Sequence, residues 1–231
     1  MITTFRRCAV AATLLALLPL PTTVAHAAAP AEASSAEAVE TAPLTVAAAQ
    51  LPVADENRTG YDRDLFRHWN AGLIPSDGCN TRNEILIAEA AAPPAVGARC
   101  ALTGGLWWSY YDEVSVTPAS SLDIDHMVPL AEAWDSGAHS WTAARRAAYA
   151  NDQGQASSLV AVTARSNRAK ADQDPAQWLP PAPSALCRYL SEWTATKLRW
   201  GLTADSSERN QLITLATDRC SGTNVTWTPA R

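Results

Sequence analysis

The first 27 residues have the layout of a secretory signal peptide, and this constrains how the rest of the chain can fold. Arg6 and Arg7 form a positively charged start, residues 8–20 are uncharged and rich in Ala and Leu, and residues 25–27 (Ala-His-Ala) have the small-x-small pattern of a cleavage site. The apolar run is shorter than the ~20 residues of a membrane-spanning helix and ends in Pro-containing sequence. We therefore expect a secreted protein with no membrane segment in its mature form, folded where disulfides form.

Export also changes the number of cysteines that can pair. The sequence has five cysteines, and removal of residues 1–27 takes Cys8 away, which leaves an even set for two disulfides. Cys79–Cys100 and Cys187–Cys220 are the favoured pairs because each brackets one short helical segment, although sequence alone leaves other pairings open. No two of these cysteines have Cys-x-x-Cys spacing, so a cysteine-ligated structural zinc site is not expected.

The charge balance excludes one class of nucleic-acid-binding protein. The formal net charge is −5, and it becomes −7 when Arg6 and Arg7 are removed with the signal. A uniformly basic protein that coats nucleic acid through many phosphate contacts is therefore excluded, whereas a local basic site is not. A hydrophobic fraction of 47% and a charged fraction of 18% also exclude a wholly disordered chain.

The remaining chain divides into a spacer and one folded domain. Residues 28–54 are rich in Ala and Pro, lack Lys and Arg, and show no sustained hydrophobic period, which predicts a disordered spacer. We expect one domain over residues 55–231, because this length suffices for a single core. The sequence leaves the oligomeric state open, with a monomer favoured. Hydrophobic period and capping residues predict helices over 81–91, 141–149, 184–200 and 206–218, and strands over 106–111, 114–117 and 159–162.

The first segment with candidate catalytic residues is 122–130, which reads Leu-Asp-Ile-Asp-His-Met-Val-Pro-Leu. Asp123 and Asp125 alternate around the apolar Ile124, so both carboxylates point to the same side of an extended segment. His126 follows directly, and a carboxylate beside an imidazole supplies a hard oxygen ligand and a base that titrates near neutral pH. An isolated Asp-His pair is more often a helix cap beside a surface histidine, so this motif needs support from elsewhere.

That support comes from residues 163–174, directly after the predicted strand 159–162. Arg165, Arg168 and Lys170 occur here with no acidic residue before Asp172. Asn167 lies among these cations and offers a neutral oxygen ligand on a surface that attracts phosphate. Alone, the segment is typical of a solvated helix face, but that interpretation is weak beside Asp-Ile-Asp-His.

Together the two motifs resemble those of HNH endonucleases. The matching residues are Asp-Ile-Asp-His-Met-Val-Pro at 123–129 and Asn-Arg-Ala-Lys-Ala-Asp at 167–172. The wider segments 125–138, 149–152, 166–181 and 187–189 look like those of secreted HNH endonuclease-family proteins, whose HNH region is similar to the C-terminal nuclease domain of GmrSD-type restriction endonucleases. The resemblance covers roughly residues 58–220, and its Trp-Leu-Pro-Pro block at 178–181 makes it more specific than an Asp-His pair alone.

The resemblance implies an α+β fold, namely a mainly helical domain around a ββα-metal core, to which the cysteine count adds two disulfides. Carried over to this sequence, Asp125 and Asn167 would be metal ligands and His126 the general base. Mg²⁺ or Mn²⁺ is the expected ion, and Zn²⁺ or Ni²⁺ is also compatible. The expected substrate is DNA, with RNA as an alternative, and the expected products carry 5′-phosphate and 3′-hydroxyl ends.

Several neighbouring residues have open roles. Arg168 and Lys170 are candidates for binding the scissile phosphate, and Asp123 and Asp172 are candidates for supporting the metal ligands or the local structure.

HNH proteins usually carry a middle Asn just before the strand that leads to the second motif, where it braces the loop that holds the base. Here Ser157-Ser158 precede that strand. The hydroxyl of Ser158 and the amide of Asn151 are alternative braces, and the sequence does not choose between them.

Three functions compete at this point. The first is a secreted, metal-dependent nuclease. The second is a non-catalytic extracellular module in which tryptophans bind a glycan or the cell wall and the HNH motif is degenerate. The third is a cell-wall hydrolase of another metal class, but the sequence lacks His-Glu-x-x-His and Gly-x-Ser-x-Gly. The paired motifs favour the nuclease.

Overall fold

The computed structural model describes residue 1 and residues 38–230. Apart from Met1, the expected signal peptide over residues 1–27 lies outside the described residues. The chain divides into one unit of residues 1–36 and a second of residues 37–231, and the fold described below is that of the second unit.

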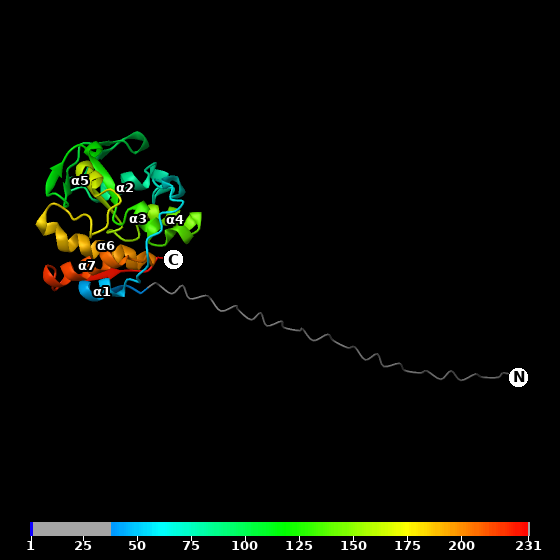
Figure 1. Cartoon of the computed structure of the whole chain (residues 1–231). Coiled ribbons are helices and arrows are strands. Elements are labelled where there is room, and N and C mark those ends of the chain that lie inside the picture. Colours follow the sequence, from blue (N-terminus) through cyan, green and yellow to red (C-terminus); the bar gives the residue numbers. More distant parts are fainter. Residues whose placement is uncertain (2–37, 231) are drawn as a thin grey trace. The chain divides into compact units, whose positions relative to one another are not determined.

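Helices make up most of the regular structure in this unit (Figure 1). The α-helices are α1 (Leu44–Gln50), α2 (Thr81–Ala88), α3 (Leu130–Asp135), α4 (Ala143–Ala150), α5 (Ala164–Lys170), α6 (Leu186–Trp200) and α7 (Ser206–Asp218). The 3-10 helices are η1 (Arg63–Leu65), η2 (Pro75–Asp77), η3 (Ala98–Cys100), η4 (Ala119–Ser121), η5 (Ala138–Ser140) and η6 (Pro183–Ala185). The four helices predicted from the sequence are therefore present as α2, α4, α6 and α7, with ends shifted by a few residues.

The strands form antiparallel pairs rather than one large sheet. They are β1 (Glu40–Pro43), β2 (Ala95–Val96), β3 (Leu102–Thr103), β4 (Trp107–Ser109), β5 (Val114–Val116), β6 (Leu122–His126), β7 (Leu159–Thr163) and β8 (Asn224–Trp227). The pairs are β1 with β8, β2 with β3, β4 with β5, and β6 with β7. The expected α+β character, with helices predominating around small sheets, is confirmed.

The structure contradicts the prediction of a disordered spacer over residues 28–54 in the part that it describes, residues 38–54; residues 28–37 lie outside the described residues. Strand β1 pairs with β8, and α1 packs against α6 and α7 (Figure 1). Leu44, Ala47, Ala48 and Leu51 are all buried. Their spacing of three and four residues places them on one helical face, which alanine-rich composition had hidden. The folded unit therefore starts well before residue 55.

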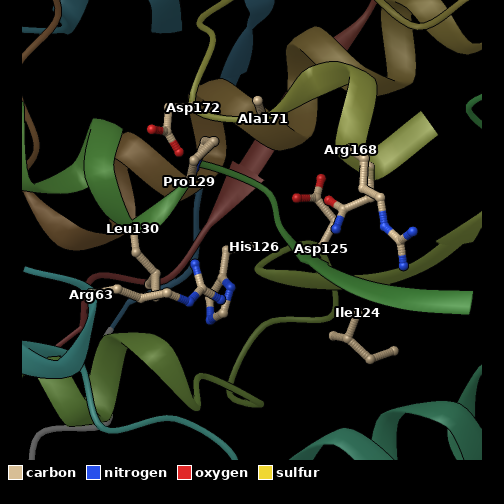
Figure 2. A pocket seen from close by; sticks show the side chains of 10 residues that line it. Arg63, Ile124, Asp125, His126, Pro129, Leu130, Arg168, Ala171 and Asp172 are labelled. Carbon is tan, nitrogen blue, oxygen red and sulfur yellow. The ribbon is translucent and has the colours of Figure 1, made fainter. Parts of the chain in front are cut away.

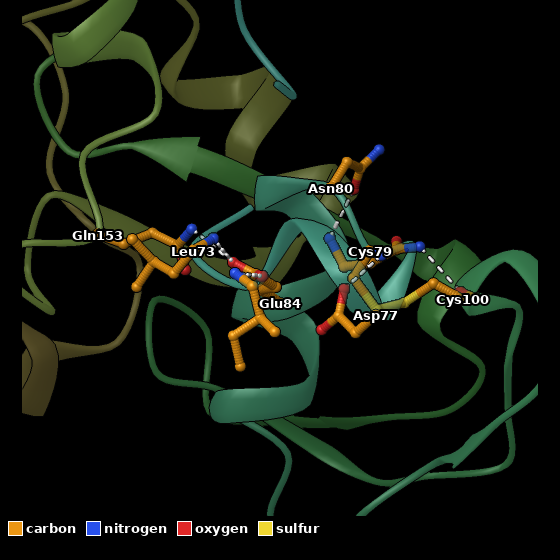
Figure 3. Close-up of a disulfide and its surroundings, with 9 residues drawn as sticks. Leu73, Asp77, Cys79, Asn80, Glu84, Cys100 and Gln153 are labelled. Atoms are coloured by element: carbon orange, nitrogen blue, oxygen red, sulfur yellow. Dashed lines mark hydrogen bonds between the residues drawn. A yellow bond between two sulfur atoms is a disulfide. The ribbon is translucent and has the colours of Figure 1, made fainter. Parts of the chain in front are cut away.

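Both predicted disulfides are present. Cys187–Cys220 joins the start of α6 to the chain just after α7, and Cys79–Cys100 joins the chain before α2 to η3. Figure 3 shows the second of these beside the cap of α2, where the side chain of Asn80 accepts a hydrogen bond of 2.9 Å from the backbone N–H of Asn83. This is the usual way of satisfying a free N–H at a helix start.

A buried ion cluster joins α3, α6 and α7. The ammonium of Lys197 contacts the carboxylates of Glu132 at 2.8 Å and Glu208 at 2.5 Å, and it also donates to the hydroxyl of Ser136 at 2.9 Å. The indole of Trp193 donates to the other oxygen of Glu208 at 2.5 Å. Lys197, Glu132 and Glu208 are almost fully buried, so their mutual contacts replace the water that each has lost.

This cluster predicts a pH-dependent stability. Burial raises the pKa of Glu208 to about 7, against the opposing effect of Lys197. Because the folded pKa is raised, the contribution of Glu208 to stability is complete below its unfolded pKa, and it is lost as the pH rises through the folded value. Glu208→Gln cannot titrate, so its free energy of unfolding should lack this fall with pH, in addition to any constant cost of losing the ion pair with Lys197.

The measurement is the free energy of unfolding by urea from about pH 5 to about pH 9. Asp218→Asn, at the exposed end of the same helix, is the matched control and should follow the wild-type profile. Parallel profiles for Glu208→Gln and wild type would contradict the assignment of this titration to Glu208.

Candidate functional site

The two sequence motifs lie on adjacent elements. Strand β6 pairs with β7 in antiparallel register, with Asp125 opposite Val160 and His126 opposite Leu159. Helix α5 follows β7 at once, and the Thr163 hydroxyl caps it by accepting a hydrogen bond of 3.2 Å from the N–H of Ser166. The first motif therefore occupies β6 and the second occupies α5, joined through β7.

Asp125 has a buried carboxylate, and one of its two oxygens accepts hydrogen bonds. Its Oδ2 accepts hydrogen bonds from the Tyr111 hydroxyl at 2.7 Å and from the Lys170 ammonium at 2.5 Å. Within residues 38–230, its Oδ1 has no hydrogen-bond partner. Burial raises the pKa of the Asp125 carboxyl, and the positive charge of Lys170 opposes that rise.

His126 is held as a neutral ring of defined tautomer. Its Nε2 lies 3.0 Å from the carbonyl oxygen of Ala150, and because a carbonyl only accepts, Nε2 carries the proton. Nδ1 is then the unprotonated nitrogen, and no hydrogen bond joins it to any other residue in the described part of the chain. Burial lowers the pKa of His126 to about 3, so the ring is uncharged at neutral pH.

Aromatic rings enclose the imidazole and account for this burial. Trp69 is stacked with His126 at 5.5 Å between ring centroids, and Tyr149 is stacked with it at 6.5 Å. The backbone of Trp69 has a positive φ of 58°, an unfavourable conformation for a large side chain. The amide of Asn151 secures this turn, because its oxygen accepts from the N–H of Asn70 at 2.9 Å and its nitrogen donates to the carbonyl of Arg67 at 2.7 Å.

Asn167 points its amide at the same region. Its Nδ2 donates to the carboxylate of Asp123 at 3.2 Å, which leaves the amide oxygen as the atom available to a ligand. Asp123 also faces Arg168 at 3.7 Å. The expected common orientation of Asp123 and Asp125 is confirmed, since both carboxylates contact α5, while Ile124 between them packs into an apolar cluster.

The side chains of Asp125, His126 and Asn167 line one cavity of about 330 Å³ (Figure 2). Its polar lining comes from Asp125, His126, Asn167, Arg168, Asp172 and Arg63. Asp172 lies at the rim, where it contacts Arg58 at 3.3 Å. The cavity thus combines two oxygen groups suited to a hard cation with an uncharged imidazole and two arginines.

Lys170 is the clearest departure from expectation. Its side chain is fully buried, and its ammonium donates to Asp125 and to the carbonyl oxygens of His126 at 3.0 Å and Met127 at 2.8 Å. An ammonium has three protons to donate, and all are engaged. The structure therefore contradicts the prediction that Lys170 binds substrate phosphate. It holds Asp125 and the backbone after it instead.

Neither candidate for the middle brace contacts His126 through its side chain. The hydroxyl of Ser158 donates to Asp152 at 2.7 Å, and its carbonyl accepts from the N–H of Met127 at 3.0 Å. Asn151 secures the turn that carries Trp69. The hydrogen bond that braces the imidazole runs from Nε2 to the carbonyl oxygen of Ala150. Ser158 and Asn151 instead support the segments around it, so no single side chain takes the place of the middle Asn.

Sequence reasoning missed Tyr111, Trp69 and Arg63 at this site. Tyr111 lies in an aromatic run that was assigned only to a strand, and Trp69 was not considered. Arg63 lies in a short 3-10 helix with no motif around it. Its proximity to the cavity depends on the tertiary fold.

Carboxylates also gather away from this cavity, around Glu56. One group adds Asp174 and Asp205 and the other adds Glu132 and Asp135, with oxygens within 4.8 Å of one another. In the second group the charges are already balanced in part, because Glu132 contacts Lys197 and Asp135 contacts Arg58 at 2.6 Å.

Comparison with known proteins places these residues in a family. Residues 97–215 match the family model described as GmrSD restriction endonucleases, C-terminal domain. A relative from Arthroderma benhamiae (strain ATCC MYA-4681 / CBS 112371), named as an uncharacterized secreted protein, is 42% identical over 156 residues, covering 68% of this chain and 74% of the relative. No solved structure gave a significant match.

The compartment agrees with the sequence expectation. The similar protein is named as secreted, and two disulfides form in the described part of the chain, as is usual outside the cytosol. The protein is accordingly extracellular. Among the described residues, no helix is both long and apolar enough to span a bilayer. With a family match over more than half its length and a relative of this identity, the chain belongs to the family of the GmrSD restriction endonuclease C-terminal domain.

Proposed function

We propose that this protein is a secreted, metal-dependent endonuclease that hydrolyses phosphodiester bonds of DNA, with RNA as an alternative substrate, through an HNH-type ββα core. The observation that carries the proposal is the geometry of His126, whose Nε2 is fixed by the carbonyl of Ala150 and which lines the same cavity as Asp125 and Asn167. A base without charge can accept a proton from water, and two hard oxygen groups beside it suit a divalent cation. Family membership supports the nuclease class.

The residues present fit such a cation. Asp125 keeps Oδ1 clear of hydrogen bonds to described residues because Tyr111 and Lys170 hold its other oxygen. Asn167 keeps its amide oxygen clear because Asp123 holds its nitrogen. Asp125 and Asn167 would therefore hold the metal, with Mg²⁺ or Mn²⁺ preferred and Zn²⁺ or Ni²⁺ as alternatives. When bound, the ion would supply the positive charge that stabilises the leaving oxygen.

Each group has the following role in the proposed hydrolysis. Nδ1 of His126 takes a proton from the attacking water as the water oxygen bonds to phosphorus. The bond between phosphorus and the 3′ oxygen breaks, and that oxygen takes up a proton from solvent. The products carry a 5′-phosphate and a 3′-hydroxyl. The hydrogen bond from Nε2 to Ala150 keeps the ring oriented while Nδ1 gains its charge.

Metal removal gives the first test. Purified secreted protein should nick supercoiled plasmid in Mg²⁺ or Mn²⁺, lose that activity in EDTA, and regain it when the metal is returned in excess. End-labelling of the products should identify 5′-phosphate. Cleavage that persists in EDTA would contradict the metal-dependent mechanism, and absence of cleavage with every metal would contradict the nuclease.

The alternative of a glycan-binding module receives less support. Trp107, Trp193 and Trp200 are buried in the core. Trp108 has 51% of its surface exposed, and it is the one exposed tryptophan of the nine, all of which lie in the described residues. A sugar platform needs accessible ring faces, and one isolated indole does not form one.

A further inference from the structure

The cavity needs a cation that can reach a phosphate, and neither predicted residue is well placed for this. Lys170 is buried with its protons engaged. Arg168 lines the cavity but faces the Asp123 carboxylate at 3.7 Å. The acidic groups Asp125 and Asp172 also line the cavity and would repel a phosphodiester. A binding site for an anion here requires positive charge from another element.

Arg63 supplies that charge from the opposite wall. It comes from η1, and Figure 2 shows its guanidinium beside the His126 ring, across the cavity from Asp125 and Arg168. Within the described residues, no carboxylate lies within ion-pair distance of Arg63, whereas Arg58 has two such partners. A planar guanidinium can donate two parallel hydrogen bonds to a phosphate, which fixes orientation as well as adding charge.

The backbone under Arg63 is anchored to the same aromatic group that supports the imidazole. The Asp62 side chain caps η1 by accepting from the N–H of Asp64 at 2.9 Å, and the carbonyl of Arg63 accepts from the N–H of Phe66 at 3.0 Å. Phe66 is fully buried, and its ring contacts that of Tyr149 at 6.2 Å between centroids. Tyr149 is stacked with His126, so Arg63 and the base have a shared support.

We propose that Arg63 binds the scissile phosphodiester through its non-bridging oxygens and holds phosphorus within reach of Nδ1 of His126. This inference rests on the proposed nuclease function and adds a substrate-binding residue to it. Residue 63 precedes the segment 97–215 that matches the family model, so the assignment comes from the tertiary structure of this chain. Arg63 approaches from one wall, and Asp125 approaches from the other (Figure 2).

The test compares Arg63→Gln and Arg63→Lys with Arg67→Gln, an exposed arginine four positions along that does not line the cavity. Two substrates are used, plasmid DNA and bis(p-nitrophenyl) phosphate, which has a single phosphodiester and no neighbouring phosphates. We expect Arg63→Gln to lower kcat/KM on both by about 100-fold, as for loss of a donor to a developing charge. Arg63→Lys should retain part of the activity, and Arg67→Gln should remain close to wild type.

Binding is measured separately, by fluorescence anisotropy of a labelled oligonucleotide with Ca²⁺ in place of the catalytic metal. Arg63→Gln should bind more weakly than Arg67→Gln, with an unchanged circular dichroism spectrum. If wild type cleaves and Arg63→Gln cleaves equally well, the role of Arg63 is overturned and the nuclease stands. If wild type cleaves neither substrate with any metal, the nuclease fails, and binding decides for Arg63: a defect specific to Arg63→Gln supports phosphate binding, and equal binding overturns it.

Discussion

Replacing His126 with alanine is expected to abolish DNA cleavage while the protein remains folded. In the proposed mechanism the imidazole is the general base, with Nε2 fixed by Ala150 and Nδ1 left to accept a proton. Loss of a positioned general base lowers rates by about 100-fold or more, so nicking should fall to near background. The buried ring also packs between Trp69 and Tyr149, so a loss of about 2 kcal/mol in unfolding free energy should accompany it.

The matched control is His139→Ala. His139 is exposed, and its Nδ1 lies 2.9 Å from the carbonyl of Trp134, so this variant removes an imidazole with a similar backbone contact that does not line the cavity. Plasmid nicking in Mg²⁺ or Mn²⁺ should match wild type for His139→Ala. Both variants should retain the wild-type circular dichroism spectrum. Equal nicking by His126→Ala and wild type would show that another group is the base.

The ligand and base candidates were readable from sequence because their geometry is local. Asp123 and Asp125 share a side because strand residues alternate, and Asn167 faces them because α5 starts directly after the strand that pairs with β6. The residues that hold these side chains in place and shift their pKa values could not be predicted from the sequence. The Ala150 carbonyl that fixes His126 belongs to a residue with no reactive side chain, and every residue has a carbonyl.

The predicted start of the folded domain at residue 55 was wrong for a different reason. Strand β1 pairs with β8, nearly the whole folded unit away in sequence, and no local pattern identifies such a partner. The helical face of Leu44, Ala47, Ala48 and Leu51 was present in the sequence. Alanine gives a weak hydrophobic signal, so the sequence of this helix could not be distinguished from the alanine-rich segment before it. Burial against α6 and α7 depends on a surface that only the folded chain provides.

For Lys170, the position along α5 was evident from the sequence, but its burial was not. Its spacing of three residues from Asn167 places it on the face of α5 that looks toward β6, where it contacts Asp125. Its burial was not predicted, because a lysine in a cationic run is typical of a solvated surface. The side chain instead lies among Tyr111, Tyr189 and Trp193, whose rings are within 6 Å of its ammonium.

This burial makes Lys170→Met the most destabilising charge substitution that we expect at the site. The change leaves the buried carboxylate of Asp125 with Tyr111 but without its cation, and it takes a donor from the carbonyls of His126 and Met127. Breaking a buried ion pair on one side costs about 3–5 kcal/mol. Arg168→Met, two positions earlier on the same helix and largely exposed, should change the free energy of unfolding by less than about 1 kcal/mol.

The double variant Asp125→Asn/Lys170→Met separates charge from packing. An asparagine can still accept a hydrogen bond from Tyr111, and no charge is then left unpaired in the core. If the cost of Lys170→Met is the isolated carboxylate, the double variant should be more stable than Lys170→Met alone, although it should not cleave DNA. Urea unfolding of wild type, both single variants and the double variant gives the coupling energy. A double variant as unstable as the sum of its singles would assign the role of Lys170 to packing and to the backbone carbonyls, rather than to Asp125.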